Sequence, residues 1–152
     1  MLKIGDQIPN IELGNQEGEM VPLRVSVGQK AMVIYFYPKN NTPGCTIEAC
    51  SFRDSYEEFV ELGAEVIGIS GDSSSSHKQV VEKRRLPFIL LSDSHRVAEK
   101  AFGVKRNVLG LLPGRVTFIV DKDGTVLDIF SSATQPTKHV SIALKTLKTA
   151  NR

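Results

Sequence analysis

Residues 31–63 read AMVIYFYPKNNTPGCTIEACSFRDSYEEFVELG, and this stretch decides the fold. Its first seven residues, 31–37, are apolar without alternation, which is typical of a strand buried on both faces of a parallel or mixed sheet. A loop rich in Pro, Asn and Gly follows. From Ile47 onward apolar residues recur at roughly helical spacing until Gly63 ends the pattern. The stretch therefore predicts a central strand, a loop and a helix over 43–62.

Strand and helix patterns continue to alternate along the rest of the chain. We predict strands at 64–70 and 88–93, helices at 77–85 and 95–104, and a hairpin of 115–120 with 125–130 around an Asp-Gly turn. The serines before the first of these helices are capping material, residues 1–30 add a small edge hairpin, and apolar residues at helical spacing predict a terminal helix. This order predicts one α/β domain over 1–152, with a thioredoxin-like fold whose central mixed sheet is flanked by helices.

Composition narrows the class of protein. A chain of 152 residues that is 41% hydrophobic and 24% charged has the size and content of one globular domain. No apolar run approaches the ~18 residues of a membrane helix, and the first residues do not resemble a secretion signal. We expect a soluble cytoplasmic protein that binds no membrane, or a plastid stromal one if a transit peptide was removed.

The basic C-terminal end does not suggest nucleic-acid binding. The net charge is +2, and after Asp128 the chain has four cations and no acid. These cations have no aromatic residues among them, as a nucleic-acid surface would, and Lys residues near the end of a helix are stabilised by its dipole. We therefore expect no nucleic-acid partner.

Cys45 is the candidate reactive residue. It lies where the central strand has ended and the next helix begins, so the helix dipole and the first-turn amides favour its thiolate. Prolines stiffen the approach, Gly44 leaves the backbone open, and the hydroxyl of Thr42 can bond to the sulfur and to a bound oxygen. The alternative is that Cys45 is only a small buried apolar residue.

Cys50 follows Cys45 by five positions. In a continuous helix this separation is about 7.5 Å along the axis and about 140° around it, and it places the α-carbons beyond the ~7 Å limit for a disulfide. The two thiols can bridge only if the start of the helix unwinds. Otherwise Cys50 simply packs on the apolar face.

Several motifs resemble the peroxiredoxins. Pro38-x-x-x-Thr42-x-x-Cys45 matches their active-site signature, and TPGCTIEAC followed by FRD is similar to the Q-type, or bacterioferritin-comigratory, branch. Further resemblance lies in GDQIPNIEL, VIGIS, PFILLSD, AFGV and GRVTFIVDKDG, so it spans nearly the whole chain. The resemblance implies a thiol-dependent peroxidase that reduces hydrogen peroxide and organic hydroperoxides.

The resemblance also implies roles for individual residues. Cys45 is the peroxidatic thiol that becomes a sulfenic acid, and Cys50 is the resolving thiol that forms an intramolecular disulfide with it. Thr42 and Arg115 bind the peroxide and stabilise the charge, while Pro38 covers the sulfur. The implied partner is thioredoxin or a similar dithiol reductant, and the protein is expected to be a monomer without metal or other cofactor.

Some alternatives stay open at this stage. Glu48 either holds Arg115 in place or is an ordinary exposed helical residue. A thioredoxin-like reductase of protein disulfides would need a second cysteine where Thr42 stands, and a redox-inert module would lack part of the signature. No zinc-ligand spacing is present, and His77, His95 and His139 are expected at the surface.

Overall fold

The computed structural model describes residues 1–106, 110 and 112–151, and its centre is a seven-stranded mixed sheet. The strands are β1 Glu12–Gly14, β2 Met20–Pro22, β3 Ala31–Phe36, β4 Ala64–Ser70, β5 Ile89–Ser92, β6 Val116–Val120 and β7 Val126–Ser131. The helices are α1 Pro43–Asp54, α2 Tyr56–Glu61, α3 Ser74–Arg84, α4 Val97–Phe102 and α5 Pro136–Ala150. Within the described ranges, no helix is long and apolar enough to cross a membrane.

The strand order, β2-β1-β5-β4-β3-β6-β7, places β3 inside the sheet. Strand β3 pairs in parallel with β4 and antiparallel with β6, β4 pairs in parallel with β5, and β6 and β7 form an antiparallel pair. The short hairpin of β1 and β2 continues the sheet at the other edge, where β1 meets β5. The predicted central strand, parallel core, closing hairpin and N-terminal hairpin are all confirmed.

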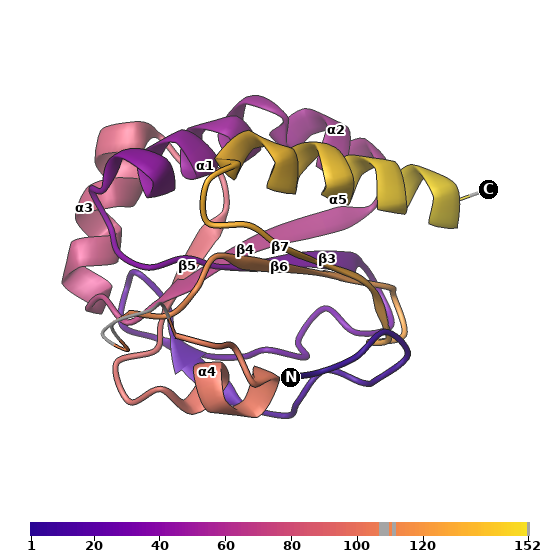
Figure 1. Cartoon of the computed structure of the whole chain (residues 1–152), viewed down its shortest axis with the longest axis horizontal. Coiled ribbons are helices and arrows are strands. Elements are labelled where there is room, and N and C mark those ends of the chain that lie inside the picture. The colour runs from indigo at the N-terminus through magenta and orange to yellow at the C-terminus, as the bar shows by residue number, and fades with distance from the viewer. Residues whose placement is uncertain (107–109, 111, 152) are drawn as a thin grey trace.

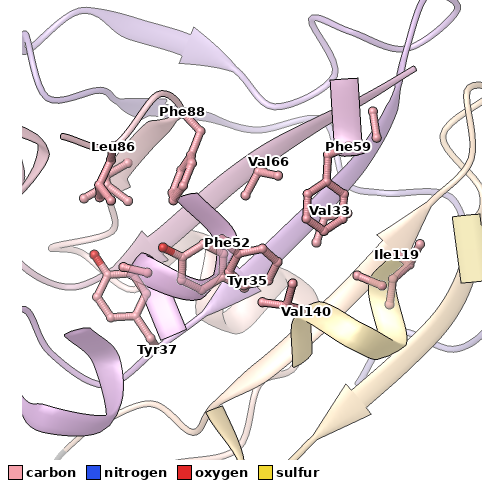
Figure 2. Packing of buried hydrophobic residues seen from close by; sticks show 14 of the residues in the cluster. Val33, Tyr35, Tyr37, Phe52, Phe59, Val66, Leu86, Phe88, Ile119 and Val140 are labelled. Atoms are coloured by element: carbon pink, nitrogen blue, oxygen red, sulfur yellow. The ribbon is translucent and has the colours of Figure 1, made fainter. Parts of the chain in front are cut away.

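Helices cover both faces of the sheet (Figure 1), and β3 supplies alternate residues to two separate cores. On one face, Val33 and Tyr35 pack against α1, α2, α3 and α5 through a cluster that includes Phe52, Phe59 and Val140 (Figure 2). On the other face, residues such as Ile34 pack against α4 and the N-terminal segment. Two buried faces explain why this strand has an unbroken apolar sequence.

The helix boundaries differ from the prediction at three places: α3 starts at Ser74 rather than at residue 77, α4 covers only Val97–Phe102 of the predicted 95–104, and the helix predicted over 43–62 is divided. Instead of one helix over 43–62 there are two, because Ser55 leaves helical geometry at φ −103° and ψ 7°. Serine is a weak residue in a helix interior, since its side chain competes for backbone hydrogen bonds. The predicted serine cap of α3 is confirmed: Ser73 accepts a hydrogen bond from the amide of Ser76.

Candidate active site

Cys45 lies in the first turn of α1, immediately beyond the end of β3. Its side chain is buried, with 4% of the residue exposed, and it is a free thiol. Helix α1 begins at Pro43, and the side chain of the N-cap residue Thr42 forms no capping hydrogen bond. The positive end of the helix dipole therefore faces the sulfur without a side-chain acceptor from the cap, which favours the thiolate.

The loop before α1 is fixed by hydrogen bonds at both of its sides. From the sequence we expected the Thr42 hydroxyl to bond to the sulfur. In the structure it instead donates to the carbonyl of Lys39 at 2.9 Å. Its oxygen keeps lone pairs that can accept a hydrogen bond from a bound ligand. The backbone amide of Asn40 donates to Asp72, and Asn41 adopts the left-handed conformation at φ 63°. Thr42 is thus held as an acceptor.

Arg115 reaches the site because of the strand register. Phe36 at the end of β3 pairs with Val116 at the start of β6, so the residue before β6 lies beside the loop that leads to Cys45. Arg115 is 7% exposed, and its Nη2 donates to the Cys45 sulfur at 3.5 Å. Residues 70 positions apart are in this way placed in direct contact.

Gly44 is required for this contact by its lack of a side chain. A β-carbon at that position would lie 2.8 Å from Nη2 of Arg115, closer than real β-carbons approach other atoms. The guanidinium therefore occupies the space that any larger residue would need. The sequence indicated that Gly44 keeps the backbone accessible. The structure shows that the group which needs this space is the Arg115 guanidinium.

Glu48 lies one helical turn after Cys45 and is fully buried, so the alternative of an exposed residue was wrong. Its Oε1 accepts a hydrogen bond from Nη1 of Arg115 at 2.8 Å. Burial raises the pKa of Glu48 to about 8, although the charge and hydrogen bond of Arg115 act to lower it. Burial also acts to lower the pKa of the Arg115 guanidinium. The neighbouring Glu48 and Cys45 outweigh this effect and raise that pKa above its usual value.

His139 completes the cluster, although we expected it at the surface. It lies in the first turn of α5, is fully buried, and its Nδ1 is 3.5 Å from Oε2 of Glu48. The ring also contacts the Thr117 hydroxyl through Nδ1 at 2.7 Å and the Ser132 carbonyl through Nε2 at 2.9 Å. The sequence did not predict this burial, because the position of a histidine on an amphipathic helix does not reveal which polar groups the helix packs against.

His77 is likewise buried rather than at the surface. Its Nδ1 lies 2.9 Å from the side-chain amide nitrogen, Nδ2, of Asn40, and its Nε2 lies 3.0 Å from the Leu91 carbonyl. Asn40 also accepts a hydrogen bond from the hydroxyl of Tyr37. His77 therefore anchors the loop before Cys45 to β5. Only His95 is exposed, as expected.

The roles predicted for Cys50 and Pro38 stay predictions. Cys50 is a half-buried free thiol on the same continuous helix as Cys45. The helix therefore separates the two sulfurs as the spacing predicts. Pro38 is half-buried and lines a cavity of about 300 Å³ whose described lining residues do not include Cys45, Thr42 or Arg115. Among the described residues, no cluster of three or more His, Cys, Asp or Glu could hold a metal ion.

Comparisons with known proteins agree with this arrangement. Residues 4–129 match the model of the AhpC/TSA family. Peroxiredoxin Q of rice chloroplasts (Oryza sativa subsp. japonica) is 49% identical over 144 residues, which are 95% of this chain and 66% of that protein. Chloroplastic peroxiredoxin Q of Sedum lineare is also 49% identical, over 95% of this chain and 77% of its own length. The chain thus spans about two thirds of the rice relative.

Solved structures give the same result. Peroxidoxin BcpB from Mycobacterium tuberculosis superposes with a TM-score of 0.91 at 41% identity, covering 98% of both chains. Peroxiredoxin Q of Xanthomonas campestris superposes with a TM-score of 0.83 at 33% identity, covering 93% of this chain and 92% of that one. The thioredoxin-like fold is confirmed, and the chain belongs to the AhpC/TSA family, within its peroxiredoxin Q (bacterioferritin-comigratory) branch.

Proposed function

We propose that this protein is a thiol-dependent peroxidase that reduces hydrogen peroxide and organic hydroperoxides with Cys45. The observation that carries the proposal is the hydrogen bond from Arg115 to the Cys45 sulfur at the start of α1. A cationic donor and a helix N-terminus both stabilise a thiolate, which is the nucleophilic form of cysteine. A related protein from X. campestris has been studied for alkyl peroxide reduction at 32% identity, which supports the substrate class.

The first step is a nucleophilic displacement at oxygen. The Cys45 thiolate attacks the terminal oxygen of the hydroperoxide, a sulfur–oxygen bond forms, and the oxygen–oxygen bond breaks. Sulfur is oxidised to a sulfenic acid, and the peroxide is reduced to an alkoxide or hydroxide that takes a proton from solvent. Thr42 accepts a hydrogen bond from the peroxide, and Arg115 stabilises the charge that develops on the departing oxygen. Pro38 shields the sulfur from bulk water.

The second step is resolution by Cys50. After the start of α1 unwinds, the Cys50 thiolate attacks the sulfenic sulfur, a disulfide forms, and hydroxide leaves to become water. Without this step, excess peroxide would carry Cys45 on to sulfinic acid. A dithiol protein of the thioredoxin type then reduces the disulfide. No metal or organic cofactor takes part.

The protein is proposed to act as a monomeric single domain of 1–152. The cytoplasm is its proposed compartment, and the plastid stroma is the alternative, because the plant relatives are chloroplastic. The two other functions considered from the sequence are less well supported. A dithiol reductase lacks a second cysteine at Thr42, and a redox-inert module would not need a buried Arg115 on the sulfur.

The test of the function uses one equivalent of peroxide and two matched variants. Cys50→Ser is expected to consume about one equivalent and to accumulate a sulfenic acid on Cys45, detected by mass spectrometry after trapping with dimedone. Cys45→Ser is expected to consume none, although it keeps the other thiol. Full turnover by Cys45→Ser would refute the assignment of Cys45.

A further inference from the structure

Glu48 has a buried oxygen that lacks a donor. Its Oε1 is bound by Arg115, but Oε2 has no hydrogen-bond partner among the described residues. Nδ1 of His139 lies 3.5 Å from this oxygen. A buried carboxylate oxygen without a donor is costly, so this position favours a proton between the two groups.

The hydrogen bonds of His139 fix which of its nitrogens faces Glu48 without a proton. The Ser132 carbonyl can only accept, so Nε2 carries the hydrogen at that 2.9 Å contact. Burial and the charge of Arg115 both lower the pKa of His139, although the Ser132 contact raises it, so the ring is neutral and Nδ1 has a lone pair. The Thr117 hydroxyl, 2.7 Å from Nδ1, can donate to that lone pair or accept from a protonated Nδ1, so the contact fits either protonation state of the ring. Oε2 of Glu48 lies 3.5 Å from the same nitrogen.

The charge of the cluster shows what a shared proton would do. The positive charge of Arg115 balances one negative charge, either an ionised Glu48 beside a Cys45 thiol or a Cys45 thiolate beside a protonated Glu48, and the raised pKa of Glu48 favours the second arrangement. When Cys45 becomes a thiolate, the same cluster gains one negative charge, unless Glu48 and His139 together take up one proton. The balance is then Cys45–SH plus Glu48–COO⁻ giving Cys45–S⁻ plus one proton on the pair, with no change in total charge.

We propose that His139 is a positioning residue of this site, which shares one proton with Glu48 and thereby keeps the buried cluster neutral while Cys45 is a thiolate. The proposal rests on the proposed function only in taking Cys45 as the reacting thiol. His139 touches neither the sulfur nor the substrate, and it acts through Glu48 and Arg115. Because linkage is reciprocal, a proton held by the pair favours the thiolate, and the thiolate favours the proton.

Apart from the Cys45 thiol, which gives up the proton, the other described groups near Glu48 do not exchange it. The titratable and charged groups around it are Cys45 on α1, Arg115 before β6, His139 on α5, and the phenols of Tyr35 and Tyr37. Burial raises the pKa of both phenols far above neutrality, so they remain uncharged. Arg115 keeps its proton at any working pH. The pair of Glu48 and His139 is therefore the part of the cluster that exchanges a proton.

The test measures the ionisation of Cys45 without any peroxide. In a Cys50→Ser background, the ultraviolet absorbance of the thiolate is followed against pH. His139→Gln can keep a nitrogen for the Ser132 carbonyl but cannot hold the shared proton, and we expect the Cys45 midpoint to rise by about one pH unit or more, a tenfold loss of thiolate below the midpoint. The exposed His95→Gln is the matched control and should leave the midpoint unchanged. A His139→Gln curve that superimposes on the control would overturn the proposal.

A second measurement does not depend on the folding of a His139 variant. Nitrogen NMR of the unsubstituted protein should show the His139 ring signals moving at the pH where Cys45 ionises, and Cys45→Ser should remove that movement. Ring signals that ignore Cys45 ionisation would equally overturn the proposal. Because neither measurement uses peroxide, a failed peroxidase assay would contradict the proposed function while leaving this result to be judged separately.

Discussion

The two halves of α1 are held to the sheet in different ways. The first half, 43–50, buries only the small side chains of Cys45 and Ala49 and the polar side chain of Glu48, while Ile47 is 50% exposed. The second half is anchored by Phe52, which is fully buried and stacks on Tyr35 with ring centroids 4.6 Å apart (Figure 2). Apolar contact therefore holds the second half, and polar contact holds the first.

This difference allows α1 to take part in both proposed steps, the reduction of peroxide and the resolution by Cys50. The first half starts with no side-chain cap and contains Gly44, a weak helix former, so unwinding it costs less than unwinding a typical helix. Its main specific contact, the pair of Glu48 and Arg115, also positions the sulfur. In the proposed resolution step, the second half would keep the chain attached while Cys45 moves toward Cys50.

The largest expected effect is on the anchor. Phe52→Ala removes a fully buried ring that also lies near Phe59 and Phe88, and it should lower the free energy of unfolding by about 3–5 kcal/mol. Ile47→Ala, the matched change in the exposed first half, should cost less than about 1 kcal/mol. Urea denaturation measures both. Equal losses would mean that the two halves are anchored alike.

Arg115 should matter more for chemistry than for stability. Arg115→Lys keeps the positive charge but loses the planar fork that donates to Glu48 and Cys45 together. We expect the second-order rate constant for peroxide to fall about 10²-fold, the usual size for loss of one preorganised donor to a developing charge. Stopped-flow kinetics at saturating reductant gives this rate constant. A rate within a factor of two of the unsubstituted protein would count against Arg115 as the donor.

Gly44→Ala separates helix stability from site geometry. Alanine is the better helix former by roughly 1 kcal/mol, but its β-carbon would meet Nη2 of Arg115 at 2.8 Å and displace the guanidinium from the sulfur. The variant should react about tenfold more slowly with peroxide, a change of about 1.4 kcal/mol, with unfolding free energy unchanged or raised. Activity and stability that fall together would instead indicate general damage to the helix.

Glu48→Gln tests the buried carboxyl through the pH dependence of stability. The pKa of Glu48 is raised from 4.5 to about 8 in the folded protein. The folded state thus binds more protons than the unfolded state between these values, and stability should fall as pH rises through that window. Glutamine cannot ionise, so the variant should not show this fall. Between pH 4.5 and 8, its free energy of unfolding should therefore rise by about 1 kcal/mol or more relative to that of the unsubstituted protein. Parallel curves would show that Glu48 titrates normally.

Local sequence patterns were enough to predict most of the fold. The unbroken apolar run of β3 and the Asp-Gly turn between β6 and β7 each encode their structure within a few residues, and both predictions are confirmed. The contact between Arg115 and Cys45 needed the family resemblance, because it depends on the register of β3 against β6. The burial of His139 depends on which face of α5 meets α1, a tertiary fact that no short motif encodes.

In the proposed mechanism, only the first half of α1 opens when Cys45 is oxidised and meets Cys50. Amide hydrogen exchange followed by mass spectrometry on reduced and peroxide-treated protein tests it directly. We predict faster exchange over 43–50 after oxidation, with exchange around Phe52 and Phe59 unchanged. Equally slow exchange over 43–50 in both redox states would contradict it.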